Sequence, residues 1–374
     1  MKWTYIQPVE IIFETGGVKR LSALLESRGL TKGVLVCDPF FAGSGLLEAV
    51  LSYAGGKLAA VYASVTPNPR IEEADACAAL LRETGADFAV ALGGGSAMDC
   101  AKAACAAALS GGPIVGYHTG GKKLSGAAVP LIAIPTTAGT GSEVTCVAVL
   151  SDEAQGVKAP IADNSMYARL ALIDPELTLS VPPRVTAATG LDVLSHALEA
   201  FWSRNHQPIC DALALRAAVL VFENLQRAFE DGDDIDAREK MCEASVIAGL
   251  AFTLPKTAAS HACSYPLTNL YGLPHGEACA FTLDLLCAVN AEAENGRLNA
   301  FARQLGFGGA RQMGAEITRL KKLTGMRVTL ADAGIDEADL PALAEKCRHP
   351  NLLNNPVPLD DALLIALFRR TKSL

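Results

Sequence analysis

The first half of the chain alternates short apolar runs with segments of helical periodicity. Residues 33–37, 58–63, 85–92 and 129–134 have the length and composition of buried parallel strands. Residues 71–83 repeat apolar positions every three or four residues, which indicates a helix. Strands that alternate with helices are typical of a parallel sheet covered by helices, so we expect an α/β domain here.

The pattern changes near residue 180, just before a Pro182-Pro183 pair. From there on the apolar spacing is helical, over residues 185–203, 209–229, 237–252, 258–270 and 275–290. A chain of 374 residues is long enough for two cores, since single cores stop growing near about 250–300 residues. We therefore predict an α/β domain over residues 1–180 and an all-helical domain over residues 181–374.

Composition excludes several classes of partner. Half of the residues are hydrophobic and 19% are charged, which argues against disorder. The net charge of −8, without a basic block, argues against nucleic acid. Apolar runs such as 101–109 end well before the roughly 20 residues that span a bilayer, and the start lacks the apolar core of a signal peptide. We expect a cytoplasmic protein with no membrane partner.

The eleven cysteines are scattered, and none form a Cys-x-x-Cys pair. Cys100, Cys105 and Cys242 fall within helical apolar patterns, as small buried side chains do. In a cytosolic chain we expect buried thiols and not disulfides. Cys263, which lies between proposed metal ligands, is interpreted as a packing residue, with a fifth metal contact as the alternative.

The helical half carries the candidate metal chemistry. Asp192 and His196 are spaced i, i+4, so on a helix they share one face. His261 and His275 enclose one short segment, with a Gly-Leu-Pro turn before the second. Three imidazole nitrogens and one carboxylate oxygen suit Fe(II) or Zn(II) better than Ca(II) or Mg(II), so we predict a four-ligand metal site. The remaining histidines are expected to be structural: His118, His206 and His349.

The first half carries the candidate cofactor loops. Residues 93–102 form a glycine turn between a strand and an Ala-rich helix, where backbone N–H groups and the helix N-terminus favour a phosphate. Residues 134–145 are rich in hydroxyls that can bind phosphates and a nicotinamide. Asp38 ends the first strand and can accept from ribose hydroxyls, which favours NAD over NADP. A tight turn and a polar helix cap are the structural alternatives for the two loops.

These residues resemble the iron-containing (group III) alcohol dehydrogenase family, essentially from end to end. The most specific segments are Gly-Gly-Gly-Ser-x-x-Asp at 93–99, Pro-Thr-Thr-Ala-Gly-Thr-Gly-Ser-Glu at 135–143, Asp192/His196 and His261/His275. The resemblance implies a dehydroquinate synthase-like fold, with an α/β dinucleotide-binding domain and a helical metal domain. It also implies hydride transfer between NAD(P)H and a carbonyl, and a dimer or larger homo-oligomer.

The resemblance also assigns residues. The implied metal ligands are Asp192, His196, His261 and His275, for Fe(II) with Zn(II) as the alternative. The implied cofactor contacts lie in or near the two loops: Asp38, Asn68, Gly94, Gly95, Ser96, Asp99, Thr136, Thr137, Thr140 and Lys158. The cofactor is expected to be NAD(H), with NADP(H) as the alternative.

Two positions depart from the family pattern. Tyr265 stands where many members have a second histidine, four residues after the third ligand. Lys256 stands where small or amide residues are usual, and either an anionic substrate or simple surface exposure explains it. We expect the catalytic residues to be these two together with His261 and His275.

The segment Lys-Thr-x-x-x-His-Ala-x-Ser-Tyr-Pro resembles a branch of the family that reduces phosphonoacetaldehyde to 2-hydroxyethylphosphonate. We therefore expect metal-dependent, NAD(P)H-linked reduction of a small anionic aldehyde, with phosphonoacetaldehyde as first candidate. A generic short-chain alcohol or diol dehydrogenase, or a sulfoacetaldehyde reductase, is the alternative. A metal-independent maleylacetate reductase-like enzyme and a non-enzymatic binding protein are less favoured, because all four ligands and the phosphate loop are present. A dehydroquinate synthase-like lyase is less favoured because the loop 135–143 resembles that of the alcohol dehydrogenase branch.

Overall fold

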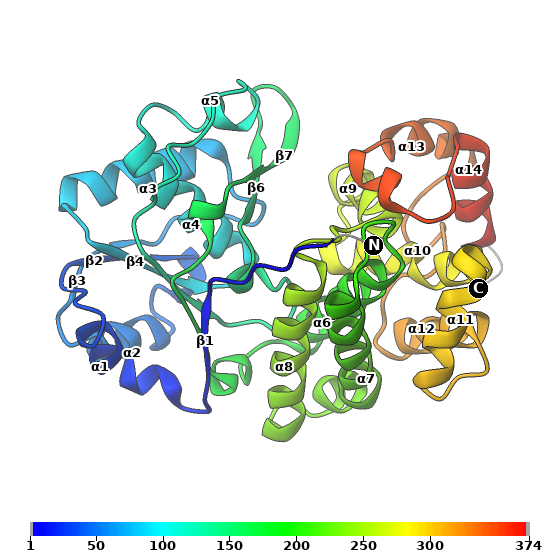
Figure 1. Cartoon of the computed structure of the whole chain (residues 1–374), viewed down its shortest axis with the longest axis horizontal. Coiled ribbons are helices and arrows are strands. Elements are labelled where there is room, and N and C mark those ends of the chain that lie inside the picture. The colour runs from blue at the N-terminus through cyan, green and yellow to red at the C-terminus, as the bar shows by residue number, and fades with distance from the viewer. Residues whose placement is uncertain (1–2, 372–374) are drawn as a thin grey trace. The chain divides into compact units, whose positions relative to one another are not determined.

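The computed structural model describes residues 3–371, which form two compact units (Figure 1). Residues 6–137 and 141–178 make an α/β unit, and residues 3–5, 138–140 and 179–371 make a helical unit. The chain passes between the units at Thr178–Leu179, beside the boundary expected near residue 180. The segment 138–140 belongs to the helical unit although its sequence neighbours belong to the α/β unit, which the sequence pattern did not indicate.

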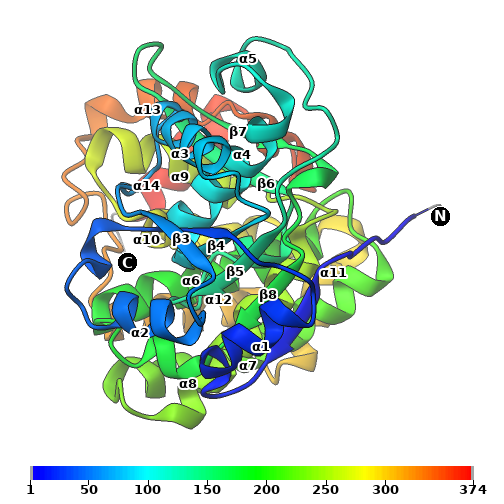
Figure 2. The same cartoon turned by 90° about the vertical axis from the view of Figure 1, so that its left-hand side faces the viewer.

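A six-stranded parallel sheet forms the core of the α/β unit, and Figure 2 shows several of its strands side by side. The strand order is β1 (Glu10–Phe13), β8 (Leu170–Ile173), β5 (Leu131–Pro135), β4 (Phe88–Gly93), β2 (Gly33–Cys37) and β3 (Leu58–Tyr62). The four inner strands are buried along their whole length, which is why they read as continuous apolar runs. The four predicted strands are confirmed as strands, and β1 and β8 add to them. The predicted burial is wrong for β3, which is an edge strand and alternates between half-buried and exposed residues.

Helices cover both faces of this sheet. Large side chains such as Leu92 and Ile134 form one face, against α1 (Leu21–Glu26) and α2 (Leu46–Tyr53). Alanines alternate with them on β4 and β5, and these small residues let the Ala-rich α4 (Gly95–Ser110) approach the other face, beside α3 (Ile71–Thr84). An antiparallel pair, β6 (Val147–Asp152) and β7 (Val157–Ala162), forms a second small sheet. The short helices here are η1 (Gly17–Arg20), η2 (Pro39–Phe41), α5 (Val115–His118), η3 (Ser142–Val144), η4 (Asn164–Met166) and η5 (Pro175–Thr178).

The helical unit is built around α6 (Pro183–Trp202), which is buried over most of its length. Its other long helices are α7 (Pro208–Glu230), α8 (Ile235–Phe252), α9 (Ala259–Tyr271), α10 (His275–Val289), α11 (Ala293–Gln304) and α12 (Ala310–Leu323). The unit ends with η6 (Glu337–Asp339), α13 (Leu340–Lys346), η7 (Pro350–Asn354) and α14 (Asp361–Arg370). The five predicted helices correspond to α6–α10, with ends within two residues of the expected ones. Over the described residues, no helix is long and apolar enough to cross a membrane.

Candidate active site

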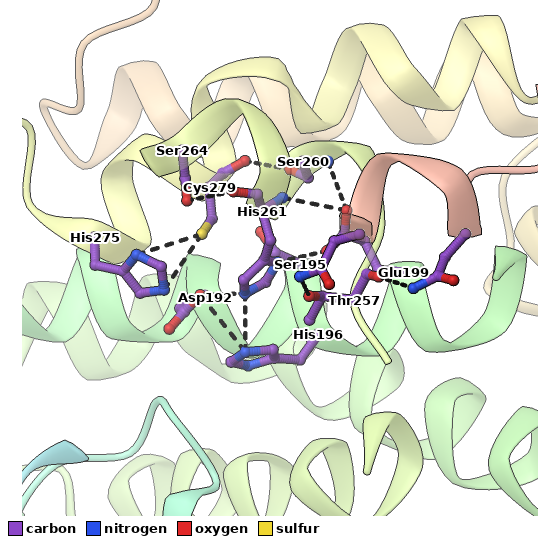
Figure 3. Close-up of polar contacts among 12 residues, drawn as sticks. Asp192, Ser195, His196, Glu199, Thr257, Ser260, His261, Ser264, His275 and Cys279 are labelled. Atoms are coloured by element: carbon purple, nitrogen blue, oxygen red, sulfur yellow. Dashed lines mark hydrogen bonds and ion pairs between the residues drawn. The ribbon is translucent and has the colours of Figure 1, made fainter. Parts of the chain in front are cut away.

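Three helices of the helical unit direct polar side chains into one buried cluster (Figure 3). Asp192 and His196 come from α6, His261 comes from α9, and His275 begins α10. The i, i+4 spacing on α6 places Asp192 and His196 on one face, as the sequence predicts. The fold therefore gathers the four expected ligands in one place.

A glycine allows α10 to reach α6 at this point. A Cβ on Gly276 would lie 2.1 Å from the carbonyl oxygen of Ala188 and 3.0 Å from the Cβ of Asp192. Any larger residue would push the two helices apart, because a backbone oxygen cannot move aside as a flexible side chain can. Gly276 thus keeps His275 beside Asp192.

The donor atoms lie at the distances expected of groups that share an ion. The Nε2 atoms of His196 and His261 are 3.0 Å apart, and Oδ1 of Asp192 lies 3.6 Å from Nε2 of His261. Nε2 of His196 is 4.0 Å from the same carboxylate oxygen. One donor atom from each of Asp192, His261, His275 and Cys279 lies within 4.8 Å of the others.

The chemistry of this cluster fits a divalent metal ion. Asp192 is 2% exposed, and its Oδ1 has no hydrogen-bond partner within the described chain. A buried carboxylate oxygen without a partner is costly unless a cation compensates it. Burial lowers the pKa of His196 to about 3, so its ring is neutral, which is the form that binds a metal.

Glu199 orients one of the expected ligands and was not predicted. Its buried carboxylate accepts hydrogen bonds from Nδ1 of His261, from the backbone N–H of Ser260 (2.6 Å) and from that of His261 (3.3 Å). The bond to Nδ1 fixes the tautomer, so that Nε2 of His261 keeps its lone pair for a metal. The spacing in the sequence could have identified Glu199, because it follows His196 by three residues and therefore lies on the same helix face.

Replacing Glu199 by glutamine is expected to lower metal affinity by about 10- to 100-fold, because the amide no longer fixes His261 in the ligand tautomer. Competition with a chromophoric chelator measures this change. Glu243→Gln is the matched control, since Glu243 pairs with Arg216 on a more exposed part of α8 and should leave affinity unchanged. Equal affinities in both variants would show that Glu199 acts only as a helix cap.

Cys279 is a further group that the sequence analysis did not select. It lies one turn after His275 on α10, and its Sγ is 3.7 Å from Nε2 and 4.0 Å from Nδ1 of that histidine. Cys263, which was weighed as a fifth ligand, is instead part of the helical core next to Cys347, as the packing interpretation predicts. The i, i+4 spacing of Cys279 from His275 could have identified Cys279 as the thiol that lies in this cluster.

Tyr265 lies one turn after His261 on α9. Burial raises the pKa of its phenol to about 12, so the hydroxyl keeps its proton. The ring of His349 lies 4.6 Å from the ring of Tyr265, and its Nδ1 accepts from the N–H of Asn351 (3.2 Å), which leaves the proton of the neutral imidazole on Nε2. His349 was expected to be merely structural, yet it belongs to the surroundings of Tyr265.

Lys256 lies in the turn between α8 and α9, where it is exposed and has a left-handed φ of 65°. The next residue, Thr257, accepts from Nδ2 of Asn351 through its hydroxyl (2.7 Å) and from Nδ2 of Asn354 through its carbonyl (2.8 Å). Both asparagines belong to η7, the segment that His349 opens. The turn of Lys256 and the ring of Tyr265 are therefore held by the same segment.

Several expected cofactor contacts meet at the N-terminus of α4. Gly94 precedes the helix without a side-chain cap, so no capping side chain competes with a ligand for the first N–H groups of α4. The N–H of Asn68 donates to Oγ of Ser96 (3.3 Å), and Nζ of Lys158 donates to Oδ1 of Asn68 (2.7 Å). An uncapped helix N-terminus beside a lysine fits a phosphate group.

Asp99 is engaged within the α/β unit. Its carboxylate accepts from the hydroxyl of Ser142 (2.6 Å) and from the N–H of Val149 (2.9 Å), and Nζ of Lys102 lies 3.8 Å away. These bonds hold the loop after β5 against α4. The geometry gives Asp99 a positioning role within the α/β unit, and its direct contact with the cofactor stays a prediction.

The other expected cofactor residues follow strand ends. Asp38 follows β2, and its carboxylate accepts from the N–H of Phe40 (2.7 Å). Thr136 follows β5, is buried, and donates its N–H to the last carbonyl of β4 (3.0 Å). Thr137 lies beside the glycine turn, whereas Thr140 is in the segment that belongs to the helical unit.

Known proteins resemble this chain over its whole length. A model described as iron-containing alcohol dehydrogenase matches residues 8–175, and one described as the C-terminal part of the Fe-containing alcohol dehydrogenase family matches residues 186–371.

Alcohol dehydrogenase 4 of Saccharomyces cerevisiae is 34% identical, over 98% of this chain and 97% of the yeast protein. The structure of a sulfoacetaldehyde reductase from Bifidobacterium kashiwanohense in complex with NAD+ is 48% identical, with a TM-score of 0.97 over 100% of this chain and 99% of that one. A 1,3-propanediol oxidoreductase structure is 31% identical, with a TM-score of 0.94 over 99% and 100% of the two chains. The chain therefore belongs to the iron-containing alcohol dehydrogenase family and is an alcohol dehydrogenase or aldehyde reductase.

Proposed function

We propose that the enzyme reduces sulfoacetaldehyde to 2-hydroxyethanesulfonate with NADH. The observation that carries this proposal is the 48% identity to a sulfoacetaldehyde reductase crystallised with NAD+, across the whole chain. Relatives named for 1,3-propanediol and methanol are 31% and 34% identical. Sulfoacetaldehyde thus replaces phosphonoacetaldehyde as first candidate, and both are two-carbon aldehydes that carry an anion.

The proposed metal ligands are Asp192, His196, His261 and His275, for Fe(II) or Zn(II). The proposed contacts to the NAD phosphates are the first N–H groups of α4, Ser96 and Lys158. When bound, the ion supplies Lewis-acid polarisation of the aldehyde and the nicotinamide supplies a hydride. Asp38 supports NAD over NADP, because a carboxylate repels a 2′-phosphate. A dimer or larger homo-oligomer stays a prediction.

Residues of the helical unit supply the remaining functions. Tyr265 keeps its proton near neutral pH and can donate a hydrogen bond to the substrate oxygen, at the place where the family pattern has a histidine. The ring of His349 packs against Tyr265 and orients it. Lys256, in the turn that η7 also holds, offers a cation for the sulfonate.

A substrate comparison tests the proposal. NADH oxidation by metal-loaded enzyme is measured with sulfoacetaldehyde, phosphonoacetaldehyde, propanal and lactaldehyde. We expect kcat/KM for sulfoacetaldehyde to exceed that of the neutral aldehydes at least about tenfold, or about 1.4 kcal/mol of transition-state preference. Similar values for all four would leave a general aldehyde reductase, and a clear preference for phosphonoacetaldehyde would restore the first candidate.

Replacing Lys256 by alanine is expected to raise KM for sulfoacetaldehyde about tenfold, because the anion loses its counter-charge, and to change KM for propanal less than about twofold. Steady-state kinetics with both aldehydes measure the difference. Lys240→Ala is the matched control, since Lys240 is an exposed lysine of α8 that pairs with Glu243. Equal effects on the charged and neutral aldehydes would place Lys256 outside the substrate site.

A further inference from the structure

Cys279 has different surroundings from three other thiols of the helical unit, Cys263, Cys287 and Cys347, which lie in its apolar core. All eleven cysteines of the chain are buried. Cys263 and Cys287 belong to the hydrophobic core of this unit, and so do Ala278 and Ala280 on either side of Cys279. Cys279 is equally buried, but it does not join that apolar cluster, and its Sγ lies among the polar side chains of the cluster in Figure 3. Contact with the metal-ligand cluster, in addition to apolar packing, therefore distinguishes this thiol.

The distances match those between donors that share one ion. Zinc binds sulfur at about 2.3 Å and imidazole nitrogen at about 2.0–2.1 Å, so two such donors on one ion lie at most about 4.4 Å apart, and about 3.6 Å apart when the angle between them is near 110°. Sγ of Cys279 lies 3.7 Å from Nε2 of His275. Donor atoms of Asp192 and His261 complete a group within 4.8 Å. The side chains are thus already close to a ligand arrangement.

A second observation at this cluster points independently to a cation. Oδ1 of Asp192 is buried and has no hydrogen-bond partner in the part of the chain that the structure describes. It lies 3.6 Å from Nε2 of His261, and both atoms belong to the group that contains Cys279. A thiolate beside this carboxylate would add a second negative charge, which a divalent ion compensates.

We propose that Cys279 is a direct ligand of the metal, so that the site offers a thiolate in addition to carboxylate and imidazole. Thiolates favour zinc over metals that prefer harder donors, whereas imidazole and carboxylate ligands suit both Fe(II) and Zn(II). Cys279 therefore makes this member of the family selective for Zn(II). The inference concerns the metal centre and holds whichever aldehyde is the substrate.

X-ray absorption at the zinc edge of the wild-type protein is the first test, and it needs no mutation. We expect one sulfur neighbour at about 2.3 Å in addition to nitrogen and oxygen neighbours at about 2.0–2.1 Å. A shell that contains only nitrogen and oxygen would overturn the proposal.

Cobalt substitution is the second test. Co(II) bound to a thiolate shows a sulfur-to-metal charge-transfer band in the near ultraviolet, so the wild type should show this band and Cys279→Ser should lose it. Cys287→Ser is the matched control, because Cys287 is a buried thiol two turns further along α10 that belongs to the core. A band that survives in Cys279→Ser, or is absent from the wild type, would contradict direct ligation.

Selectivity is measured in the same variants by competition between Zn(II) and Fe(II) under anaerobic conditions. Cys279→Ser should lower the preference for Zn(II) at least about tenfold, a loss as large as that from removing an outer-shell partner. An unchanged preference would refute the selectivity. None of these readouts uses substrate, so they stand or fall separately from the sulfoacetaldehyde assay.

Discussion

Replacing His261 by alanine is expected to lower kcat at least about a thousandfold, or about 4 kcal/mol of transition-state stabilisation. The reason is that the proposed metal centre loses an imidazole ligand that lies beside its other ligands. Nε2 of His261 lies 3.0 Å from Nε2 of His196 and 3.6 Å from Oδ1 of Asp192, and Nδ1 of His261 forms the hydrogen bond to Glu199. Metal content should fall with activity. NADH binding should persist, because the proposed phosphate contacts lie in the α/β unit.

His206→Ala is the matched control for this variant. His206 is a partly buried histidine of the same unit that pairs with Asp211 (3.1 Å) and lies outside the metal cluster. Its removal should leave metal content and kcat unchanged. Turnover by metal-free His261→Ala enzyme at the wild-type rate would remove the metal from the reaction.

Most of the elements that the sequence predicted are either buried along their whole length or show a regular repeat of apolar positions. β2 and β4 are buried on both faces, so they read as unbroken apolar runs, and α6 to α10 repeat with the period of a helix. β1 and β8 were not predicted, because each has only four residues, and a segment that short shows no clear pattern of apolar positions. The capture of residues 138–140 by the helical unit depends on tertiary packing that no local pattern encodes.

The residues of the candidate site also fall into two groups, those whose positions follow from local spacing and those whose positions depend on tertiary packing. The converging side chains of α6 were predictable because spacing on one helix fixes which residues share a face, and Glu199 and Cys279 obey the same rule. The neighbourhood of His349 and Tyr265 was not predictable, since it joins two segments far apart in the sequence. The sequence motif that contains Asp99 also did not predict that its carboxylate would accept a hydrogen bond from Ser142.

Replacing Lys102 by methionine is expected to destabilise the α/β unit by about 3–5 kcal/mol, because it leaves a buried partner charge uncompensated. Lys102 is fully buried and donates to Oγ of Ser142 (2.6 Å), Oγ1 of Thr145 (3.0 Å) and the carbonyl of Val147 (2.9 Å). It ties α4 to the loop after β5 and is the cation nearest to the carboxylate of Asp99. Methionine keeps the length and apolar stem and removes only the charge and the three donors.

The expected loss depends on pH. Burial raises the pKa of Asp99, so its folded state binds a proton more readily than the unfolded chain does. A carboxyl group of this kind contributes most to stability at low pH, and the contribution falls as pH rises through its folded pKa. Without Lys102 the charged carboxylate has less compensation, so the variant should lose more stability at about pH 8 than at about pH 5.

Hydrogen exchange of the amides of α4 and β4 is the appropriate measurement, since both tryptophans, Trp3 and Trp202, belong to the helical unit and their fluorescence would not report on this one. Lys19→Met, at an exposed ion pair with Glu176 in the same unit, is the control and should leave exchange unchanged. Lys102→Met with Asp99→Asn should recover part of the protection, because the second change removes the stranded charge. Unchanged exchange in Lys102→Met would mean that the buried ammonium contributes no net stability, since its desolvation offsets its hydrogen bonds.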